Sequence, residues 1–305
     1  MKKQIGFVVL LLILSFIQVN AQDFAGIKQI NGTGMYCKVI GKGEPMIIVH
    51  GGPGMAHNYL LKPFSQLADN NKLIFYDQRG NGLSDEFKKG EKVTVDDLVE
   101  DLECLRKEFG IEKMQLVGQS WGAIIAINYS AKYPQNVKKL FLLEPAPGSS
   151  EYLPEFVKRI SERLNQTEKE ERAALTNNPS IRIDPVLYKK LSNLQFKAYY
   201  FDTKRQDLNK MDYMDSARVK KMFASSAMFG SYIGNFNLYE KMKSITSPTL
   251  IIHGDYDVIP TESIEKMKLS IPQAEMHIIK ECGHFVHVEK EKEYFDLIRA
   301  FLNKK

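Results

Sequence analysis

Between residues 35 and 143 the chain alternates short, continuously apolar runs with longer segments in which apolar positions recur every three to four residues. The short runs predict buried strands, and the longer segments predict helices with one apolar face. Such an alternation is typical of a parallel sheet covered by helices on both faces. The expected strands span residues 36–40, 46–49, 73–76, 114–117 and 140–143, and the expected helices span residues 57–68, 94–109 and 121–133.

The alternation stops at residues 144–148, Glu-Pro-Ala-Pro-Gly, because neither a helix interior nor a central strand tolerates these prolines. Helical patterns fill the next stretch, and the buried-strand pattern then returns. We expect a strand at 249–252, a helix at 262–269, a strand at 275–279 and a closing helix at 288–302. The sequence therefore predicts an α/β core, residues 22–146 and 243–305, into which a helical cap, residues 147–242, is inserted.

The first 21 residues have the pattern of a cleaved secretory signal peptide. Lys2 and Lys3 precede an apolar stretch at residues 5–19. Small residues stand just before the expected cleavage point, which lies after Ala21. The stretch is shorter than the roughly 20 residues of a membrane span, so a permanent anchor is the less favoured alternative. No cysteine follows the cleavage point for a lipid anchor. We expect a secreted or periplasmic protein without a stable membrane anchor.

Charge and cysteine content narrow the functional classes. Removing two lysines lowers the formal charge from +5 to +3, and the remaining lysines alternate with acids, which argues against a nucleic-acid partner. Cys37, Cys104 and Cys282 cannot all pair within one chain, and none has metal-ligand spacing. Three buried or partly buried thiols are expected, with one disulfide as the alternative.

A serine elbow lies between an expected strand and an expected helix, in Gly118-Gln119-Ser120-Trp121-Gly122. A sharp strand-to-helix turn exposes the serine hydroxyl at the carboxyl edge of the sheet. The serine needs a histidine base and a carboxylate that orients this base. We therefore expect Ser120 to be a catalytic nucleophile. The alternative is an ordinary turn in which Ser120 caps the helix.

The base and the acid are expected after the two late strands, in the chain order Ser, Asp, His. Asp257 is the favoured acid, because Asp255 is better placed to shape the turn by accepting backbone amides. His284 is the favoured base, because Gly283 permits an unusual backbone just past a strand. His287, the nearest rival, suits a capping or packing role.

Acyl transfer also needs backbone amides that bind the developing oxyanion. One donor is expected to be the amide of Trp121, which follows the nucleophile. The second is expected from the glycine-rich loop His50-Gly51-Gly52-Pro53-Gly54, and Gly52 is our choice. His50 is expected to brace this loop rather than to transfer protons.

Five short motifs lie at expected strand ends: His50-Gly51-Gly52-Pro53-Gly54, Asp77-Gln78-Arg79-Gly80-Asn81-Gly82-Leu83-Ser84, Gly118-Gln119-Ser120-Trp121-Gly122, Gly254-Asp255-Tyr256-Asp257 and Gly283-His284-Phe285. Together they resemble the α/β-hydrolase family and, within it, the proline iminopeptidase branch. The resemblance covers residues 35–146 and 245–303. It implies the triad Ser120, Asp257 and His284, an oxyanion hole at the amides of Gly52 and Trp121, and no metal or organic cofactor. Arg79 is expected to be structural.

The resemblance implies a serine aminopeptidase that releases an N-terminal residue, proline being one candidate, from short peptides through an acyl-enzyme. The expected signal peptide adds that this enzyme is secreted. A carboxylesterase or lactonase with the same triad is the alternative, and a catalytically silent binding protein is a further one. A small molecule or short peptide is the expected partner, and the sequence carries no signal of oligomeric state.

The chain departs from the branch at Gln119, where its members carry a second glycine before the nucleophile. Their cap also offers acids that hold the substrate's amino terminus. The candidates for that role here are Glu144, Glu151, Glu155, Asp212, Asp215 and Glu240.

Overall fold

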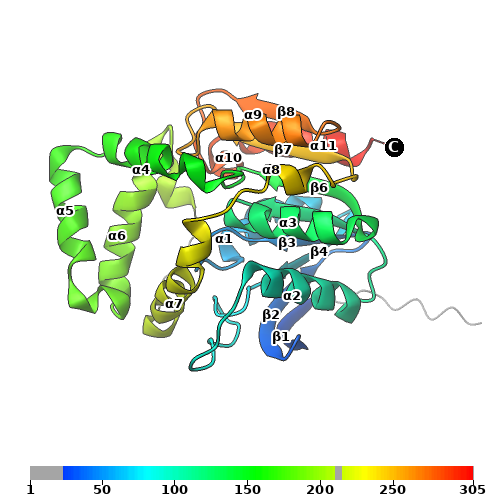
Figure 1. Ribbon diagram of the computed structural model, residues 1–305, viewed down its shortest axis with the longest axis horizontal. Helices are drawn as coiled ribbons and strands as arrows, with labels where there is room; N and C mark the ends of the chain where they lie inside the picture. The colour runs from blue at the N-terminus through cyan, green and yellow to red at the C-terminus, as the bar shows by residue number, and fades with distance from the viewer. Residues whose placement is uncertain (1–22, 210–214, 305) are drawn as a thin grey trace, which may run out of the picture.

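The computed structural model describes residues 23–209 and 215–304, and its centre is an eight-stranded sheet in the order β1-β2-β4-β3-β5-β6-β7-β8 (Figure 1). The expected signal peptide and Asp212 lie outside the described residues. All seven expected strands are confirmed. The eight strands are β1 (Phe24–Ile30), β2 (Thr33–Ile40), β3 (Glu44–Val49), β4 (Asn71–Tyr76), β5 (Met114–Gln119), β6 (Val137–Leu143), β7 (Thr249–Gly254) and β8 (Glu275–Ile279).

The sheet is mostly parallel, as the alternation of strands and helices predicts. Strands β3 to β8 pair in parallel, whereas β2 pairs antiparallel with both β1 and β4. Strand β1 was not expected, because it is a half-exposed edge strand with weak apolar alternation. The turn between β1 and β2 does carry a sequence signal: Asn31 and Gly32 both have positive φ, the two-residue Asn-Gly hairpin.

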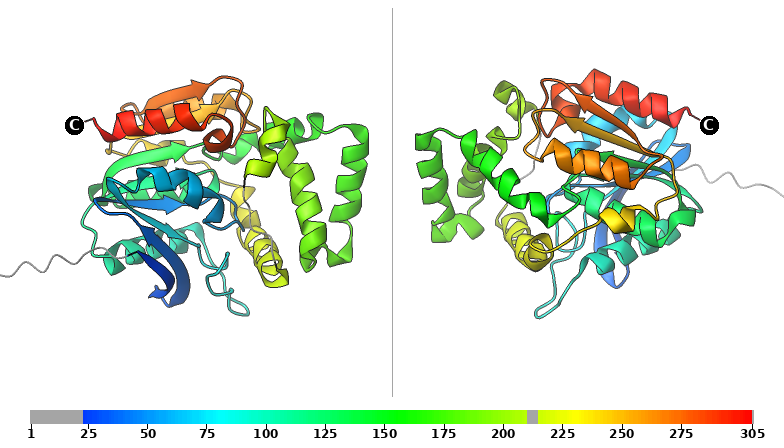
Figure 2. Two further views of the ribbon diagram at one scale, coloured as in Figure 1. Left: turned by 180° about the vertical axis from the view of Figure 1, so that it is seen from behind. Right: turned by 45° about the horizontal axis from the view of Figure 1, so that its top comes forward.

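Helices cover both faces of the sheet (Figure 2). Helices α2 (Val95–Glu108), α3 (Trp121–Lys132) and α9 (Thr261–Ser270) share one apolar core with the sheet, and α1 (Asn58–Phe64) and α11 (Glu291–Leu302) share the other. No helix within residues 23–209 and 215–304 is both long enough and apolar enough to span a membrane.

Two expected helices are shorter in the structure. The segment at 57–68 forms α1 and then the 3₁₀ turn Ser65–Leu67. The closing helix at 288–302 is divided into α10 (Val286–Glu289) and α11, because Lys290 leaves the helical conformation. The carboxylate of Glu289 accepts the N–H of Gly283 and that of Asp202, which ties α10 to the loop before it and to the segment between β6 and β7.

The segment between β6 and β7 is helical. Helices α4 (Leu153–Glu162), α5 (Gln166–Thr176), α6 (Pro185–Lys197) and α7 (Ser216–Ile233) lie beyond the carboxyl ends of the parallel strands, and α8 (Tyr239–Met242) lies against α3 and α9 (Figure 1). We call residues 147–242 the cap segment. Its helices have local start signals: Asn165, Asp184 and Asp215 each accept backbone amides at a helix N-terminus.

Candidate active site

Ser120 lies on the turn between β5 and α3, with φ 52° and ψ −119°. This conformation is strained for a residue with a side chain, and it is typical of a serine elbow. The neighbouring glycines do not have positive φ; they provide space instead. A Cβ on Gly118 would lie 2.6 Å from the carbonyl oxygen of Gly122, and a Cβ on Gly122 would collide with that of Val49. The hydroxyl of Ser120 does not cap α3.

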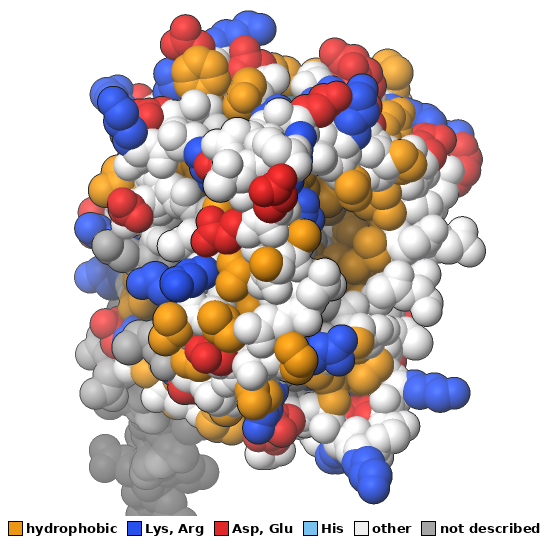
Figure 3. Space-filling view, turned by 90° about the vertical axis from the view of Figure 1, so that its left-hand side faces the viewer, with side chains coloured by type: hydrophobic (Ala, Val, Ile, Leu, Met, Phe, Trp, Pro, Cys, Tyr) orange, Lys and Arg blue, Asp and Glu red, His pale blue; other side chains and the backbone are white. Residues whose placement is uncertain are grey.

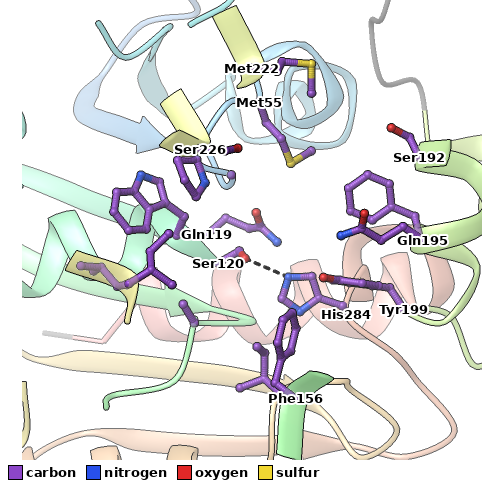
Figure 4. A pocket seen from close by; sticks show the side chains of 18 of the residues that line it. Met55, Gln119, Ser120, Phe156, Ser192, Gln195, Tyr199, Met222, Ser226 and His284 are labelled. Carbon is purple, nitrogen blue, oxygen red and sulfur yellow. Dashed lines mark hydrogen bonds between the residues drawn. The ribbon is translucent and has the colours of Figure 1, made fainter. Parts of the chain in front are cut away.

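A chain of hydrogen bonds joins Ser120, His284 and Asp257. Figure 4 shows the bond between Ser120 and His284. His284 Nε2 lies 3.0 Å from Ser120 Oγ, and its Nδ1 lies 2.8 Å from Oδ2 and 3.0 Å from Oδ1 of Asp257. Asp257 is fully buried, and its Oδ1 also accepts the N–H of Ile259 at 2.9 Å. The three residues expected from widely separated motifs therefore come together at the carboxyl edge of the sheet.

The electrostatic surroundings keep Asp257 ionised. Burial alone would raise the pKa of this carboxyl, but the facing imidazoles of His284 and His253 and the N–H of Ile259 outweigh burial and lower the pKa below its usual value. The ionised carboxylate holds a proton on His284 Nδ1. The Nε2 atom that faces Ser120 is then free to accept a proton.

The backbone presents His284 through close packing with the cap segment. The N–H of His284 donates to the carbonyl of Tyr199 at 2.7 Å, and a Cβ on Gly283 would collide with the same carbonyl. Gly283 has no positive φ, so its function is to provide space rather than an unusual backbone. The position of His284 is thus fixed by both the sheet and the cap segment.

The rival residues have other surroundings. The carboxylate of Asp255 faces the amide of Cys282 and the ammonium of Lys280, in the turn role expected for it. His287 is buried among aromatic rings, and burial lowers its pKa to about 3. These contacts agree with a packing role for His287, and of the two histidines it is His284 that faces Ser120.

The glycine-rich loop at residues 50–54 is held by hydrogen bonds on its core side. His50 is buried, its Nδ1 donates to the carbonyl of Gly51 at 2.7 Å, and its Nε2 accepts the N–H of Gln78 at 3.1 Å. Burial lowers the pKa of His50 to about 4, so the ring is neutral and braces the loop as expected.

The two expected oxyanion donors border the same cavity as Ser120. Gly52 and Trp121 both line it. The N–H of Trp121 is the first amide of α3, so no carbonyl of its own helix can accept from it. The positive end of the helix dipole adds to the attraction for an anion at this place. The arrangement suits the stabilisation of a developing oxyanion.

Gln119 connects the elbow to the glycine-rich loop. Its Oε1 accepts the hydroxyl of Tyr59 at 2.6 Å, and the hydroxyl oxygen of Tyr59 accepts the N–H of Gly51 at 2.8 Å. Glu144 is fully buried and lies next to Gln119 and Tyr294. Burial, together with repulsion from Asp257, raises the pKa of Glu144 well above its usual value. The sequence marks Gln119 only as a departure from the family pattern, and its connecting role follows from the contacts.

A cavity of about 390 Å³ opens beside Ser120. It is lined mainly by apolar side chains of α4, α6, α7 and the strand-end loops, and the end of the molecule formed by the cap segment is hollowed and lined by hydrophobic side chains (Figure 3). This size lies at the lower end of the roughly 300–1,000 Å³ usual for small-molecule sites. The polar side chains that line it, the tyrosines apart, are Gln119, Ser120, Ser192, Gln195, Ser226 and His284.

None of the acidic candidates in the described residues lines this cavity. Glu144 is buried next to Gln119, and Asp212 lies outside the described residues. The other four bind cations or cap a helix elsewhere: Glu151 pairs with Lys266, Glu155 with Arg159, Asp215 caps α7, and Glu240 pairs with Lys243.

The remaining candidate groups are structural. Arg79 donates to both oxygens of the buried Asp101 and to Glu91, as expected for a structural arginine. Cys37, Cys104 and Cys282 are free thiols. Within residues 23–209 and 215–304, no three His, Cys, Asp or Glu side chains form a group able to hold a metal ion.

Comparisons with known proteins agree with this geometry. A family model described as alpha/beta hydrolase fold matches residues 44–291. The proline iminopeptidase of Thermoplasma volcanium is 28% identical, covering 92% of this chain and 96% of its own, and that of Lactobacillus helveticus is 29% identical, covering 88% and 94%. The crystal structure of proline iminopeptidase from Mycobacterium smegmatis superposes with a TM-score of 0.68 at 19% identity, covering 92% of this chain and 97% of that one.

Proposed function

The chain belongs to the alpha/beta hydrolase fold family. We propose that it is a serine aminopeptidase that releases N-terminal residues, including proline, from short peptides. The observation that carries the proposal is the hydrogen-bonded chain Ser120, His284 and Asp257 at the edge of a cavity. Relatives at 28–29% identity over most of the chain are named proline iminopeptidases, which supports a peptidase rather than an esterase.

The first half of the reaction forms an acyl-enzyme. The Oγ of Ser120 bonds to the carbonyl carbon of the substrate while His284 Nε2 takes the hydroxyl proton. Asp257 stabilises the resulting imidazolium of His284. The amides of Gly52 and Trp121 donate to the oxyanion, and each such donor is worth about 10²- to 10³-fold in rate. The C–N bond then breaks, and the imidazolium of His284 gives its proton to the leaving amine.

The second half releases the N-terminal residue. His284 takes a proton from a water molecule as the water oxygen bonds to the acyl carbon. The C–O bond to Ser120 then breaks, and the hydroxyl regains its proton from His284. The small size of the cavity supports an exopeptidase, because it fits one chain end and excludes a folded protein.

Turnover of matched substrates tests the proposal. We expect hydrolysis of prolyl and alanyl arylamides, and loss of this activity by a factor of about 10³ or more in Ser120→Ala. Ser231→Ala, an exposed serine of α7 outside the cavity, is the matched control and keeps the activity. Hydrolysis of short-chain aryl esters without any hydrolysis of arylamides would contradict the peptidase activity and support an esterase.

Residues 1–21 are proposed to act as a secretory signal peptide, on the strength of their charged start, apolar stretch and small-residue end. N-terminal sequencing of the protein exported by its native host should then begin at Gln22. A mature chain that begins at Met1 contradicts this proposal.

A further inference from the structure

We propose that Gln119 and Tyr59 are positioning residues of the oxyanion hole, and that together they hold the N–H of Gly52 where it can donate to the oxyanion. This inference rests on the proposed function and names what sets the geometry of its reacting site. Gln119 and Tyr59 act through the backbone of the glycine-rich loop, and neither side chain bonds to the reacting atoms of the substrate.

The two oxyanion donors lie on segments that the sheet alone does not hold together. Trp121 lies after β5, directly beyond Ser120, and Gly52 lies on the loop after β3. The parallel pairing of these two strands ends at the pair Val49 and Gly118. Both donors lie beyond that pair, so their separation depends on contacts between the loop and the serine elbow.

Gln119 and Tyr59 form such a contact. The hydroxyl of Tyr59 accepts the N–H of Gly51 at 2.8 Å and donates to Gln119 Oε1 at 2.6 Å. Gln119 directly precedes Ser120 and lines the cavity beside it (Figure 4), and Gly51 directly precedes Gly52. Two hydrogen bonds in series therefore join the elbow to the residue before the expected donor.

Gly51 also packs directly against these groups. A Cβ on Gly51 would lie 2.6 Å from Gln119 Oε1 and 2.9 Å from the hydroxyl oxygen of Tyr59. It would also lie 3.1 Å from the Cβ of Ser120. The glycine-rich loop therefore rests on the elbow at Gly51, and Gln119 and Tyr59 form the surface on which it rests.

The orientation of the Gly52 N–H follows from the bonds that Gly51 makes. The carbonyl of Gly51 accepts from His50 Nδ1 at 2.7 Å, and the N–H of Gly51 donates to Tyr59. The carbonyl of Gly51 and the N–H of Gly52 belong to one planar peptide group and point in opposite directions. Fixing both polar groups of Gly51 therefore fixes the direction in which the Gly52 N–H points.

Burial makes this link rigid. Gln119 and Tyr59 are both buried, and the ring of Tyr59 packs edge-on against that of Phe285. Burial also raises the pKa of Tyr59 above its usual value, so its hydroxyl keeps the proton that it donates. Glycine, which the proline iminopeptidase branch carries in place of Gln119, has no side chain to accept this proton. The link is therefore not implied by the family pattern.

Tyr59→Phe removes the hydroxyl and keeps the ring. In hydrolysis of a short-chain aryl ester we expect kcat to fall by about 10- to 10²-fold with KM little changed, because displacement forfeits part of the 10²- to 10³-fold that one donor contributes in the transition state. Tyr129→Phe is the matched control. It removes a buried hydroxyl that donates to Glu103 at 2.7 Å, outside the cavity, and should keep kcat.

A thionoester, in which sulfur replaces the carbonyl oxygen of the same ester, shows whether the loss arises at the oxyanion. Sulfur accepts hydrogen bonds weakly, so the thionoester depends less on the two amides. We expect the ratio of kcat/KM for the ester to kcat/KM for the thionoester to fall by about fivefold or more in Tyr59→Phe and to stay unchanged in Tyr129→Phe. A purely structural defect slows both substrates by the same factor.

Gln119→Met tests the other end of the link, also where Tyr59→Phe does not fold. It removes the acceptor with little change of volume and should lower kcat and the ester-to-thionoester ratio in the same way. Gln115→Met, buried on the same strand β5 but outside the cavity, is its matched control. Combining Tyr59→Phe with Gln119→Met should cost no more than about twofold beyond the larger single loss, because both changes break one link.

The outcomes separate this inference from the proposed function. With arylamides hydrolysed, a fall in kcat of less than about fivefold in both single variants, an unchanged ester-to-thionoester ratio, or single losses that multiply in the double variant overturns the inference and leaves the aminopeptidase standing. Turnover of the esters alone, with the expected ratios, supports the inference and overturns the aminopeptidase. No turnover of ester, thionoester or arylamide by the unaltered protein overturns both.

Discussion

Asp257→Asn removes the carboxylate that orients His284 but leaves His284 in place, so it tests how much the activity depends on this orientation. The introduced asparagine would place its carbonyl oxygen where Oδ1 of Asp257 accepts the N–H of Ile259, at 2.9 Å. Its NH₂ group would then occupy the position of Oδ2, which lies 2.8 Å from His284 Nδ1 and 3.3 Å from His253 Nδ1.

That orientation gives His284 the wrong tautomer. An N–H that donates to Nδ1 forces the imidazole proton onto Nε2, which then donates to Ser120 and cannot accept its proton. We expect kcat to fall by about 10⁴-fold, equivalent to about 5.5 kcal/mol, with KM little changed. Steady-state hydrolysis of a prolyl arylamide measures both constants, and circular dichroism with thermal melting checks the fold.

Asp255→Asn is the matched control, two residues away in the same loop. The carboxylate of Asp255 faces the amide of Cys282 and Lys280, so kcat should stay within a few fold of the original value. The reasoning is refuted if the Asp257 variant keeps a tenth or more of the activity, or if the two variants lose activity equally.

Two further predictions concern stability. Glu144 is neutral in the fold and ionises in the unfolded chain above its ordinary pKa of 4.5, so unfolding releases a proton and stability falls as the pH rises. Glu144→Gln should therefore gain stability relative to the original protein between pH 4 and 7 in urea titrations, whereas the exposed Glu151→Gln should show no such trend. Gly122→Ala should destabilise the protein by about 1–3 kcal/mol or more, because its Cβ meets the carbonyl of Val49. Gly230→Ala, with open space around it in α7, should gain about 0.4–1 kcal/mol, and an equal loss in both would contradict the steric argument.

The sheet was predictable because each parallel strand carries its own signal. Buried on both faces, β3 to β7 read as continuous apolar runs bounded by turns. The edge strand β1 has one neighbour and an exposed side, and its large apolar residues Phe24, Ile27 and Ile30 do not alternate with polar ones as in a half-buried strand. The break between α10 and α11 lies at Lys290, whose backbone leaves the helical conformation although the local sequence carries no glycine or proline there.

The triad was predictable for a topological reason. Ser120, Asp257 and His284 each follow a strand directly or by a few residues, and parallel strands bring their carboxyl ends to one edge. A correct strand assignment therefore places all three residues together. The glycines near Ser120 and His284 did mark the site, but not because they have an unusual backbone. Gly118, Gly122 and Gly283 provide space for close packing, and the strained φ belongs to Ser120.

The cavity wall was less predictable than the triad. Many of its residues come from α4, α6 and α7, which lie outside the sheet. Part of the cap segment packs around a small apolar cluster of its own, which contains Leu175, Ile181 and Leu191. Periodicity identifies which residues of a helix are apolar, but it does not tell which of them face a cavity. The described acids of the cap segment illustrate this. Their residue type suggested an amine site, but Glu151 and Glu240 pair with lysines, Glu155 pairs with Arg159, and Asp215 caps α7. The cap segment also reaches the triad, because the carbonyl of Tyr199 accepts the N–H of His284 at 2.7 Å. A change in the packing of the cap segment is therefore expected to move His284 together with the cavity wall.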